Sequence, residues 1–193
     1  MNKVFLFLLF ASFALLSCQS LSSEQNTTTE VANSKLRDYM TEGKKITATA
    51  FAALSGKLQT AMQEGGVANA VSYCNIAALP LIDSLAQANN ASIKRTSLKY
   101  RNPLDAPTKA EIEVLNTFAD QLQKEKPLSP LVVEHNFYAP IRIATPCLKC
   151  HGKIGETLTE SDYKHILKTY PEDKAIGYVP GDLRGMWVVS FKK

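Results

Sequence analysis

The chain has 193 residues, with 22 Lys and Arg against 18 Asp and Glu, for a formal net charge of +4 at pH 7. This mild excess forms no basic stripe with interleaved aromatic residues, so nucleic acid is not an expected partner. The length beyond an N-terminal leader suits one compact domain, because domains typically have about 100–150 residues.

The first residues predict a leader. Lys3 precedes an uncharged apolar run, Val4–Leu16, which is shorter than the roughly 20 residues of a membrane-spanning helix and is typical of a secretory signal. The run ends in L-L-S-C at Cys18, which resembles the bacterial lipobox. We predict a signal peptide over residues 1–17 and a lipid on Cys18 that anchors the protein to a membrane of the bacterial cell envelope, outside the cytoplasm. An ordinary signal peptide with a chance cysteine is the alternative.

Residues 18–40 predict a flexible tether, because their largely polar composition cannot bury a core. The domain proper is predicted over residues 41–193. Nothing in it is long and apolar enough to span a bilayer. We therefore expect a protein that is held at a membrane only by its lipid.

Two helices are expected at the start of the domain. The apolar residues of the first recur at helical spacing, and Gly65-Gly66 should end it. These residues are Ile46, Phe51, Leu54, Leu58 and Met62. The second helix should begin at Val67, and its steps of four, three and four place one set of residues on a single face. That set is Val67, Val71, Cys74 and Ala78. Pro80 removes a backbone donor, so it should kink this helix or start a new one through Asn89.

Strands and helices follow in alternation. Residues 92–99 predict a strand, and a Pro-containing loop leads to Thr108 and Glu111, which form a capping box for a helix. The buried face of that helix is expected to be Ile112, Leu115, Phe118, Ala119 and Leu122.

The rest of the chain predicts further strands and one short helix. Residues 131–144 look extended, with Pro140 at an edge or a bulge. A short helix over 159–169 and a strand at M-W-V-V-S-F close the chain. Short strands without regular crossovers favour an α+β fold with a small antiparallel sheet packed against helices.

The segment Cys147-Leu148-Lys149-Cys150-His151 is C-x-x-C-H, the attachment signature of a c-type haem. Thiols at this spacing can reach the two vinyl groups on one edge of a porphyrin, and the next histidine can offer a ring nitrogen to iron. We predict one covalently attached haem c, with His151 as proximal ligand. A thioredoxin-like dithiol would normally lie in a βαβ unit, and a structural zinc site needs four ligands. The chain predicts neither.

The sixth position of the iron leaves several candidates open. Methionine is the usual partner in cytochromes c, and histidine is also available. The candidates of these two types are Met40, Met62, Met186, His135 and His165. Cys74 is a further candidate, since a lipid on Cys18 and thioethers at the haem motif would leave it without a disulfide partner. A buried free cysteine can equally be a small hydrophobic core residue.

Several short segments, covering roughly residues 45–193 in order, resemble one family. They are A-V-S-Y-C-N, R-T-S-L-K-Y-R-N-P-L-D-A-P, F-Y-A-P-I, C-L-K-C-H-G, Y-P-E-D-K-A-I-G-Y and P-G-D-L-R-G. The chain is similar to the PAS-like, single-haem c-type cytochrome family first described in cyanobacteria and found as extracytoplasmic modules of bacterial sensor proteins. The resemblance implies a PAS-like α+β fold and a haem held between a histidine and a cysteine. Carried over by position, His151 is one axial ligand and Cys74 is the other.

Other residues near these motifs have expected roles. Arg95, Arg101 and Arg142 could pair with the haem propionates, or could be ordinary surface arginines. Gly152 should allow a tight turn beside the haem. The segment Gly181–Gly185 is expected to be a turn before the last strand and not a phosphate loop, because it lacks the strand-then-helix context of one.

One haem motif, a candidate thiolate ligand and no catalytic constellation predict a membrane-tethered haem protein that is not an enzyme. We expect it to sense redox state or a small gas ligand, or to exchange electrons, and each role needs a redox or signalling protein as partner. A plain periplasmic electron carrier is the alternative. A haem peroxidase, with His135 or His165 as acid–base group, is a third possibility.

Overall fold

The computed structural model describes residues 20–76 and 78–192. The chain divides into two compact units, Met1–Lys35 and Leu36–Lys193. The predicted signal peptide and the predicted lipid site at Cys18 lie outside the described residues. Within the described residues, no single helix combines the length and apolar character needed to cross a membrane.

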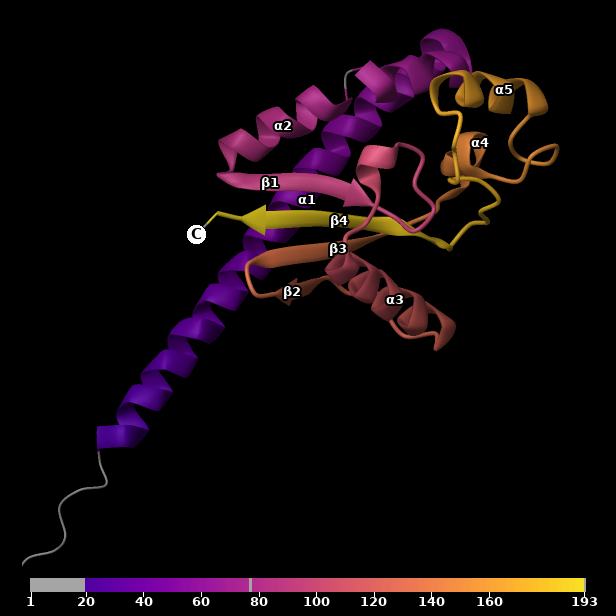
Figure 1. Cartoon of the computed structure of the whole chain (residues 1–193). Coiled ribbons are helices and arrows are strands. Elements are labelled where there is room, and N and C mark those ends of the chain that lie inside the picture. The colour runs from indigo at the N-terminus through magenta and orange to yellow at the C-terminus, as the bar shows by residue number, and fades with distance from the viewer. Residues whose placement is uncertain (1–19, 77, 193) are drawn as a thin grey trace, which may run out of the picture. The chain divides into compact units, whose positions relative to one another are not determined.

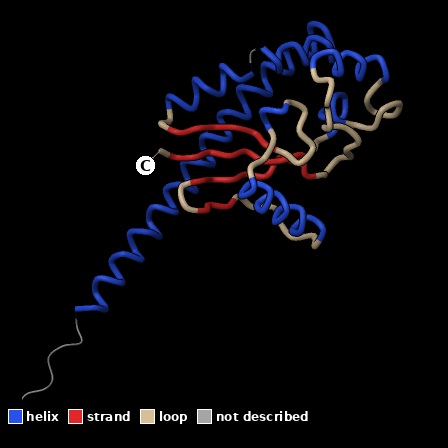
Figure 2. Tube along the Cα trace, viewed as in Figure 1, coloured by secondary structure: helices blue, strands red, loops and turns tan. Residues whose placement is uncertain are grey.

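Five α-helices and one four-stranded antiparallel sheet make up the described structure (Figures 1 and 2). The helices are α1 (Ser20–Ile76), α2 (Ala78–Ala88), α3 (Lys109–Gln123), α4 (Leu148–His151) and α5 (Glu160–Thr169). The strands are β1 (Ala91–Thr96), β2 (Leu131–Val133), β3 (Asn136–Arg142) and β4 (Leu183–Phe191). Short 3₁₀ turns, Pro103–Asp105 and Thr145–Cys147, precede α3 and α4. The predicted α+β fold with a small antiparallel sheet is confirmed.

The sheet has the order β1-β4-β3-β2 and carries a helical layer on each face (Figure 1). Successive side chains of a strand point to opposite faces, and the buried residues follow this rule. Phe137 and Trp187 pack with α1 and α2 on one face. Tyr138 and Met186 pack with Leu115 and Phe118, the latter pair from α3, on the other face. The two faces thus hold separate apolar clusters.

The structure differs from the prediction of a flexible tether over residues 18–40. The structure describes residues 20–40 as part of α1, and the end of that stretch belongs to the fold. The ring of Tyr39 stacks on Phe191, with centroids 4.7 Å apart, and Met40 packs against the cluster under α1 and α2. The predicted boundary at residue 41 is therefore too late, because two large side chains anchor the helix before it.

The local signals of helix ends in the sequence are confirmed. Gly65 and Gly66 have non-helical backbone angles that interrupt α1. Pro80 lies in the first turn of α2, where its missing N–H is not needed. The Thr108 hydroxyl accepts from the Glu111 backbone N–H, and the Glu111 carboxylate accepts from the Thr108 N–H, which completes the predicted capping box.

The segment over 131–144, which was predicted to be extended, forms a hairpin of β2 and β3 whose last residues pair irregularly. β2 pairs only with residues 136–138 of β3. Pro140 lies beyond that pairing, so the edge of β3 that faces away from β4 is free there, and a register shift follows between Ile141 and Arg142. The predicted edge or bulge position of Pro140 is thus satisfied inside a strand that is otherwise interior.

A third apolar cluster lies beyond the sheet, at the end of the unit that holds α5. Val67 and Val71, near the end of α1, pack with Leu158, Ile166 and Tyr170. This cluster holds α5 against α1 and includes Cys150 at its margin. It therefore fixes α4, which carries the C-x-x-C-H motif, relative to the last turns of α1, which carry Cys74.

The crossing of α1 over β3 depends on a glycine. A Cβ built on Gly43 would overlap the fully buried ring of Phe137, whereas a Cβ on Gly56 in the same helix meets nothing within 4 Å. We expect Gly43→Ala to lower the free energy of unfolding by about 1–3 kcal/mol through overpacking. Gly56→Ala should raise it by about 0.5–1 kcal/mol through helix propensity. Urea denaturation followed by circular dichroism measures both, and equal effects would contradict the close crossing.

Candidate functional site

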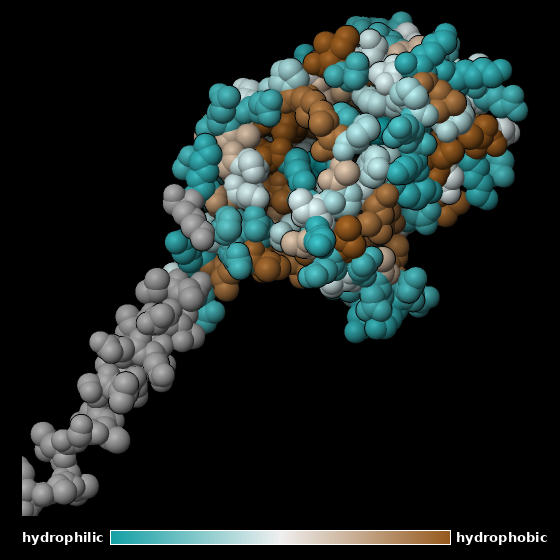
Figure 3. Space-filling model, in the orientation of Figure 1, coloured by the Kyte–Doolittle hydropathy of each residue, from teal (hydrophilic) through white to brown (hydrophobic). Residues whose placement is uncertain are grey.

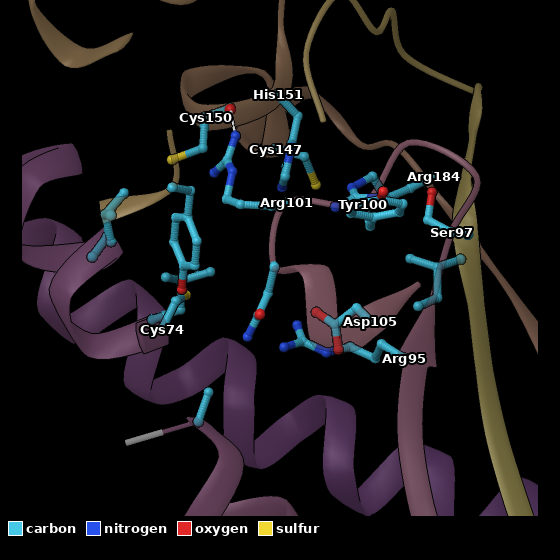
Figure 4. A pocket seen from close by; sticks show the side chains of 18 of the residues that line it. Cys74, Arg95, Ser97, Tyr100, Arg101, Asp105, Cys147, Cys150, His151 and Arg184 are labelled. Carbon is cyan, nitrogen blue, oxygen red and sulfur yellow. Dashed lines mark hydrogen bonds between the residues drawn. The ribbon is translucent and has the colours of Figure 1, made fainter. Parts of the chain in front are cut away.

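A cavity of about 240 Å³ lies where α1, α4 and the end of the sheet meet. Residues far apart in sequence line it, among them Cys74, Cys147, Cys150 and His151. Figure 4 shows Cys74 on α1 across the cavity from the α4 segment. Figure 3 shows a hollow with hydrophobic side chains around it on the visible face of the unit. The C-x-x-C-H motif and Cys74 therefore share one partly apolar cavity.

The C-x-x-C-H motif owes its shape to a single turn of helix. Cys147 ends a 3₁₀ turn, and Cys150 and His151 lie in α4. The chain can turn immediately afterwards because Gly152 has no side chain. A Cβ there would overlap the Thr157 hydroxyl and lie 2.6 Å from the Leu148 carbonyl oxygen. The tight turn predicted at this glycine is confirmed.

The two rival interpretations of this motif find no support in the described residues. The sheet is wholly antiparallel, so the motif does not lie in a βαβ unit of the thioredoxin type. Over residues 20–76 and 78–192, no group of three or more His, Cys, Asp or Glu side chains could hold a metal ion. Cys74, Cys147 and Cys150 are free thiols.

The ring of His151 is held in one tautomer. Its Nδ1 lies 2.7 Å from the carbonyl oxygen of Ala175, which can only accept, so Nδ1 carries the proton. Nε2 is then left with its lone pair, the form in which imidazole binds a metal. Burial holds the pKa of His151 well below its usual range, and Arg184 and Arg101 lower this pKa further. The ring is therefore neutral and oriented before any ligand binds.

A buried ion pair fixes the backbone around this histidine. Arg101 binds both carboxylate oxygens of Asp173, each at 3.1 Å, and donates to the carbonyl oxygen of Cys150 at 2.6 Å. The same carboxylate accepts from the N–H of Ala175 at 2.9 Å, the residue whose carbonyl orients His151. Arg101 and Asp173 come from the segments R-N-P-L-D-A-P and Y-P-E-D-K-A-I-G-Y. These two segments thus meet in one hydrogen-bond network. The network supports the backbone of the C-x-x-C-H segment.

Cys74 lies on the cavity side of α1. Val71 and Ala78, which share its predicted face, also line the cavity and are buried. Burial raises the pKa of its thiol, and Arg95 and Arg101 oppose that shift. The pKa of Cys150 is raised by burial to about 11. Both thiols are therefore neutral at physiological pH without a cation at the sulfur.

The other candidates for the sixth ligand of the iron differ in whether they line the cavity. Met62 lines the cavity. Met186 is fully buried in the cluster under α3, and Met40 packs under α1 and α2. His135 lies in the turn between β2 and β3, and His165 is exposed on α5. Among the described residues that were candidates, only Cys74 and Met62 line the cavity.

The arginines that were predicted to pair with haem propionates also differ in their positions relative to the cavity. Arg95 lines the cavity, whereas Arg142 is exposed and donates to the Gly181 carbonyl. Arg101 lines the cavity but is engaged by Asp173. Arg184, which sequence reasoning treated only as part of a turn, lines the cavity as well. Its position at the start of β4 could not be assigned without the pairing of β4 with β1.

A family model matches residues 17–192. The chain belongs to the Tll0287-like family. The crystal structure of the cyanobacterial heme-protein Tll0287 matches with a TM-score of 0.53 and 25% sequence identity, covering 79% of this chain and 96% of that chain. No curated protein matches the chain. The resemblance to a cyanobacterial haem-protein family is therefore confirmed, and the ligand assignments stay predictions.

The Arg101–Asp173 pair gives a test of this architecture. The side chain of Asp173 is fully buried and that of Arg101 is 13% exposed. Asp173→Asn leaves a buried guanidinium without its carboxylate, which should lower the free energy of unfolding by about 3 kcal/mol. Asp120→Asn, which breaks an exposed pair with Lys124, should change it by less than about 0.5 kcal/mol. Chemical denaturation of both variants checks this, and a small effect of Asp173→Asn would show that the network is dispensable.

Proposed function

We propose that this protein is an extracytoplasmic haem protein, anchored by a lipid at Cys18, that acts in redox or small-ligand sensing or in electron exchange. Cys147 and Cys150 attach one haem c, His151 is its proximal ligand and Cys74 is the sixth. The relationship to the cyanobacterial heme-protein supports the cofactor. A sheet with helices on both faces and a cavity at its end supports a PAS-like domain.

The observation that carries the proposal is the shared cavity. The attachment thiols, a neutral histidine with a free Nε2 and a lone thiol across the cavity come together from two distant parts of the chain. These residues fit a haem, since both axial donor types are known haem ligands. When bound, the haem supplies an iron that cycles between two oxidation states.

The protein residues determine how that iron would behave. A thiolate from Cys74 is anionic and favours the ferric state, so the reduction potential should be low compared with a His/Met cytochrome. His151 keeps its orientation in both states because Ala175 holds Nδ1. Cys74 sits in surroundings that favour the neutral thiol. Loss of the sulfur from iron on reduction would open a position for a small ligand, which suits a sensor.

One observation favours a second candidate function, a plain electron carrier. Met62 lines the same cavity, and a His/Met pair would hold the iron in both oxidation states. A peroxidase is less well supported, because neither His135 nor His165 is among the described residues that line the cavity. Sensing and carrying electrons both require a partner protein.

The test is the spectroscopy of the ferric protein produced with its haem. Mass spectrometry should first find one haem attached covalently through Cys147 and Cys150. We then expect a low-spin electron paramagnetic resonance signal of thiolate ligation that Cys74→Ala abolishes, because the anionic sulfur sets the ligand field. Met62→Leu, a matched change at the other cavity-lining candidate, should leave the signal intact.

The opposite pattern would change the assignment. A signal that survives Cys74→Ala and is lost in Met62→Leu would make Met62 the ligand and favour the electron carrier. Failure of the reduced wild-type protein to bind carbon monoxide or nitric oxide would remove the gas-sensing role. Absence of covalent haem from the wild type would overturn the proposal as a whole.

The membrane anchor has its own test. Cys18→Ser removes the sulfur that would carry the lipid, so we expect the protein to move from the membrane fraction to the soluble fraction. Cell fractionation followed by immunoblotting measures the distribution. Ser17→Ala, which keeps a small residue before the cysteine, should leave the protein with the membrane. Membrane association that survives Cys18→Ser would contradict lipidation at this residue.

A further inference from the structure

The cavity holds more positive than negative charge. The charged side chains among its described lining are Arg95, Arg101, Lys149, Arg184 and Asp105. Arg101 already has a carboxylate partner in Asp173. Lys149 is exposed, so Arg95 and Arg184 are left to share the single carboxyl group of Asp105, which leaves positive charge in surplus. An anionic ligand with two carboxylates would neutralise it.

Arg95 and Arg184 are placed to meet such a ligand. Arg95 extends from β1, with its guanidinium carbon 5.7 Å from the centroid of the Trp187 ring, and the described residues give it no ion pair. Arg184 extends from the start of β4 and donates one N–H to the Lys99 carbonyl at 3.1 Å. Each guanidinium has five N–H donors, so most of them have no partner among the described groups.

The surroundings of Arg184 make its charge costly without an anion. Burial lowers the pKa of Arg184, and the neighbouring charges of Arg101 and Arg95 lower it too. Burial raises the pKa of Asp105 although Arg95 and Arg184 oppose the shift. A buried charge without a counter-charge is destabilising. Arg95 and Arg184 would therefore be stabilised by a bound anion, because the described residues offer them only the carboxyl group of Asp105.

We propose that Arg95 and Arg184 bind the two propionate carboxylates of the haem. This assignment rests on the proposed function. The thiols of Cys147 and Cys150 hold the edge of the porphyrin that carries the vinyl groups, and the propionates leave from the opposite edge. Figure 4 shows Arg95 and Asp105 at the far side of the cavity from α4, and Arg184 on the wall beside Tyr100 and Ser97. Guanidinium and carboxylate match in a bidentate geometry.

The test compares Arg95→Gln and Arg184→Gln with the haem-loaded wild type. Resonance Raman spectroscopy reports the propionate bending band, which should lie at the frequency of hydrogen-bonded carboxylates in the wild type and shift toward that of free ones in each variant. Loss of a nearby cation disfavours the reduced state. The ratio of reduced to oxidised protein at a fixed potential should therefore fall several-fold. Arg142→Gln, outside the described cavity lining, is the matched control and should change neither reading.

Conservative variants separate charge from geometry. Arg95→Lys and Arg184→Lys keep the charge and lose the bidentate fork, so the Raman band should shift while the reduced-to-oxidised ratio stays near that of the wild type. If a Gln variant does not fold, the Raman bands of the Lys variants and of the wild type still test the propionate assignment. A band at the free-carboxylate frequency in the wild type, or one unchanged in these variants, overturns the propionate assignment.

The remaining outcomes concern other sources of the anion. Inorganic phosphate or acetate added to the haem-loaded wild type should leave the band and the ratio unchanged, because the haem itself fills the site. A saturable shift would assign the arginines to a soluble anion and overturn the assignment. A wild type without covalent haem is a failure of the proposed function, and mass spectrometry detects it before the arginines are tested.

Discussion

The site depends on the buried pair of Arg101 and Asp173. This pair ties the loop after β1 to the loop after α5, and through the carbonyl oxygens of Cys150 and Ala175 it ties both to the haem motif. A short helix such as α4 cannot hold its own orientation, since one turn makes few internal hydrogen bonds. The ion pair and its backbone contacts supply what the helix lacks.

The part of α1 that follows its bend at Gly65 and Gly66 positions Cys74, on the opposite side of the cavity from α4. At Gly43 the helix packs closely against the sheet, because the missing side chain lets it approach Phe137. After the non-helical Gly65 and Gly66 it continues along α5 to Cys74. One element therefore contributes to the sheet core and to the cavity. Strain or overpacking at the first contact would be transmitted toward the second, because packed interiors deform little.

The electrostatics of the cavity follow from this arrangement. Arg95 and Arg184 lie on adjacent antiparallel strands, with Gly185 between Arg184 and the paired segment of β4 allowing close approach to Thr96. Three arginines then surround a neutral histidine and two neutral thiols. The positive charge of these arginines would suit the anionic cofactor and the thiolate ligand that we propose.

Local signals in the sequence predicted much of the fold. The Thr108–Glu111 capping box, the Gly65-Gly66 break and the helix with Pro80 in its first turn are each determined by residues within a few positions of one another, so they needed no tertiary information. The tether was wrong near its end, because Tyr39 is anchored by Phe191, about 150 residues away along the chain. Periodicity within a segment cannot report such a partner.

By itself the sequence determined the C-x-x-C-H motif, the apolar face that carries Cys74 and the α+β class, because spacing and side-chain periodicity are local properties. Only the tertiary structure decided that Cys74 and Met62 share the cavity while Met40, Met186, His135 and His165 do not. It also decided that Arg101 is a structural partner of Asp173 and that Arg184 joins Arg95 in the cavity. These outcomes depend on strand register and on contacts between distant loops, which chain folding alone creates.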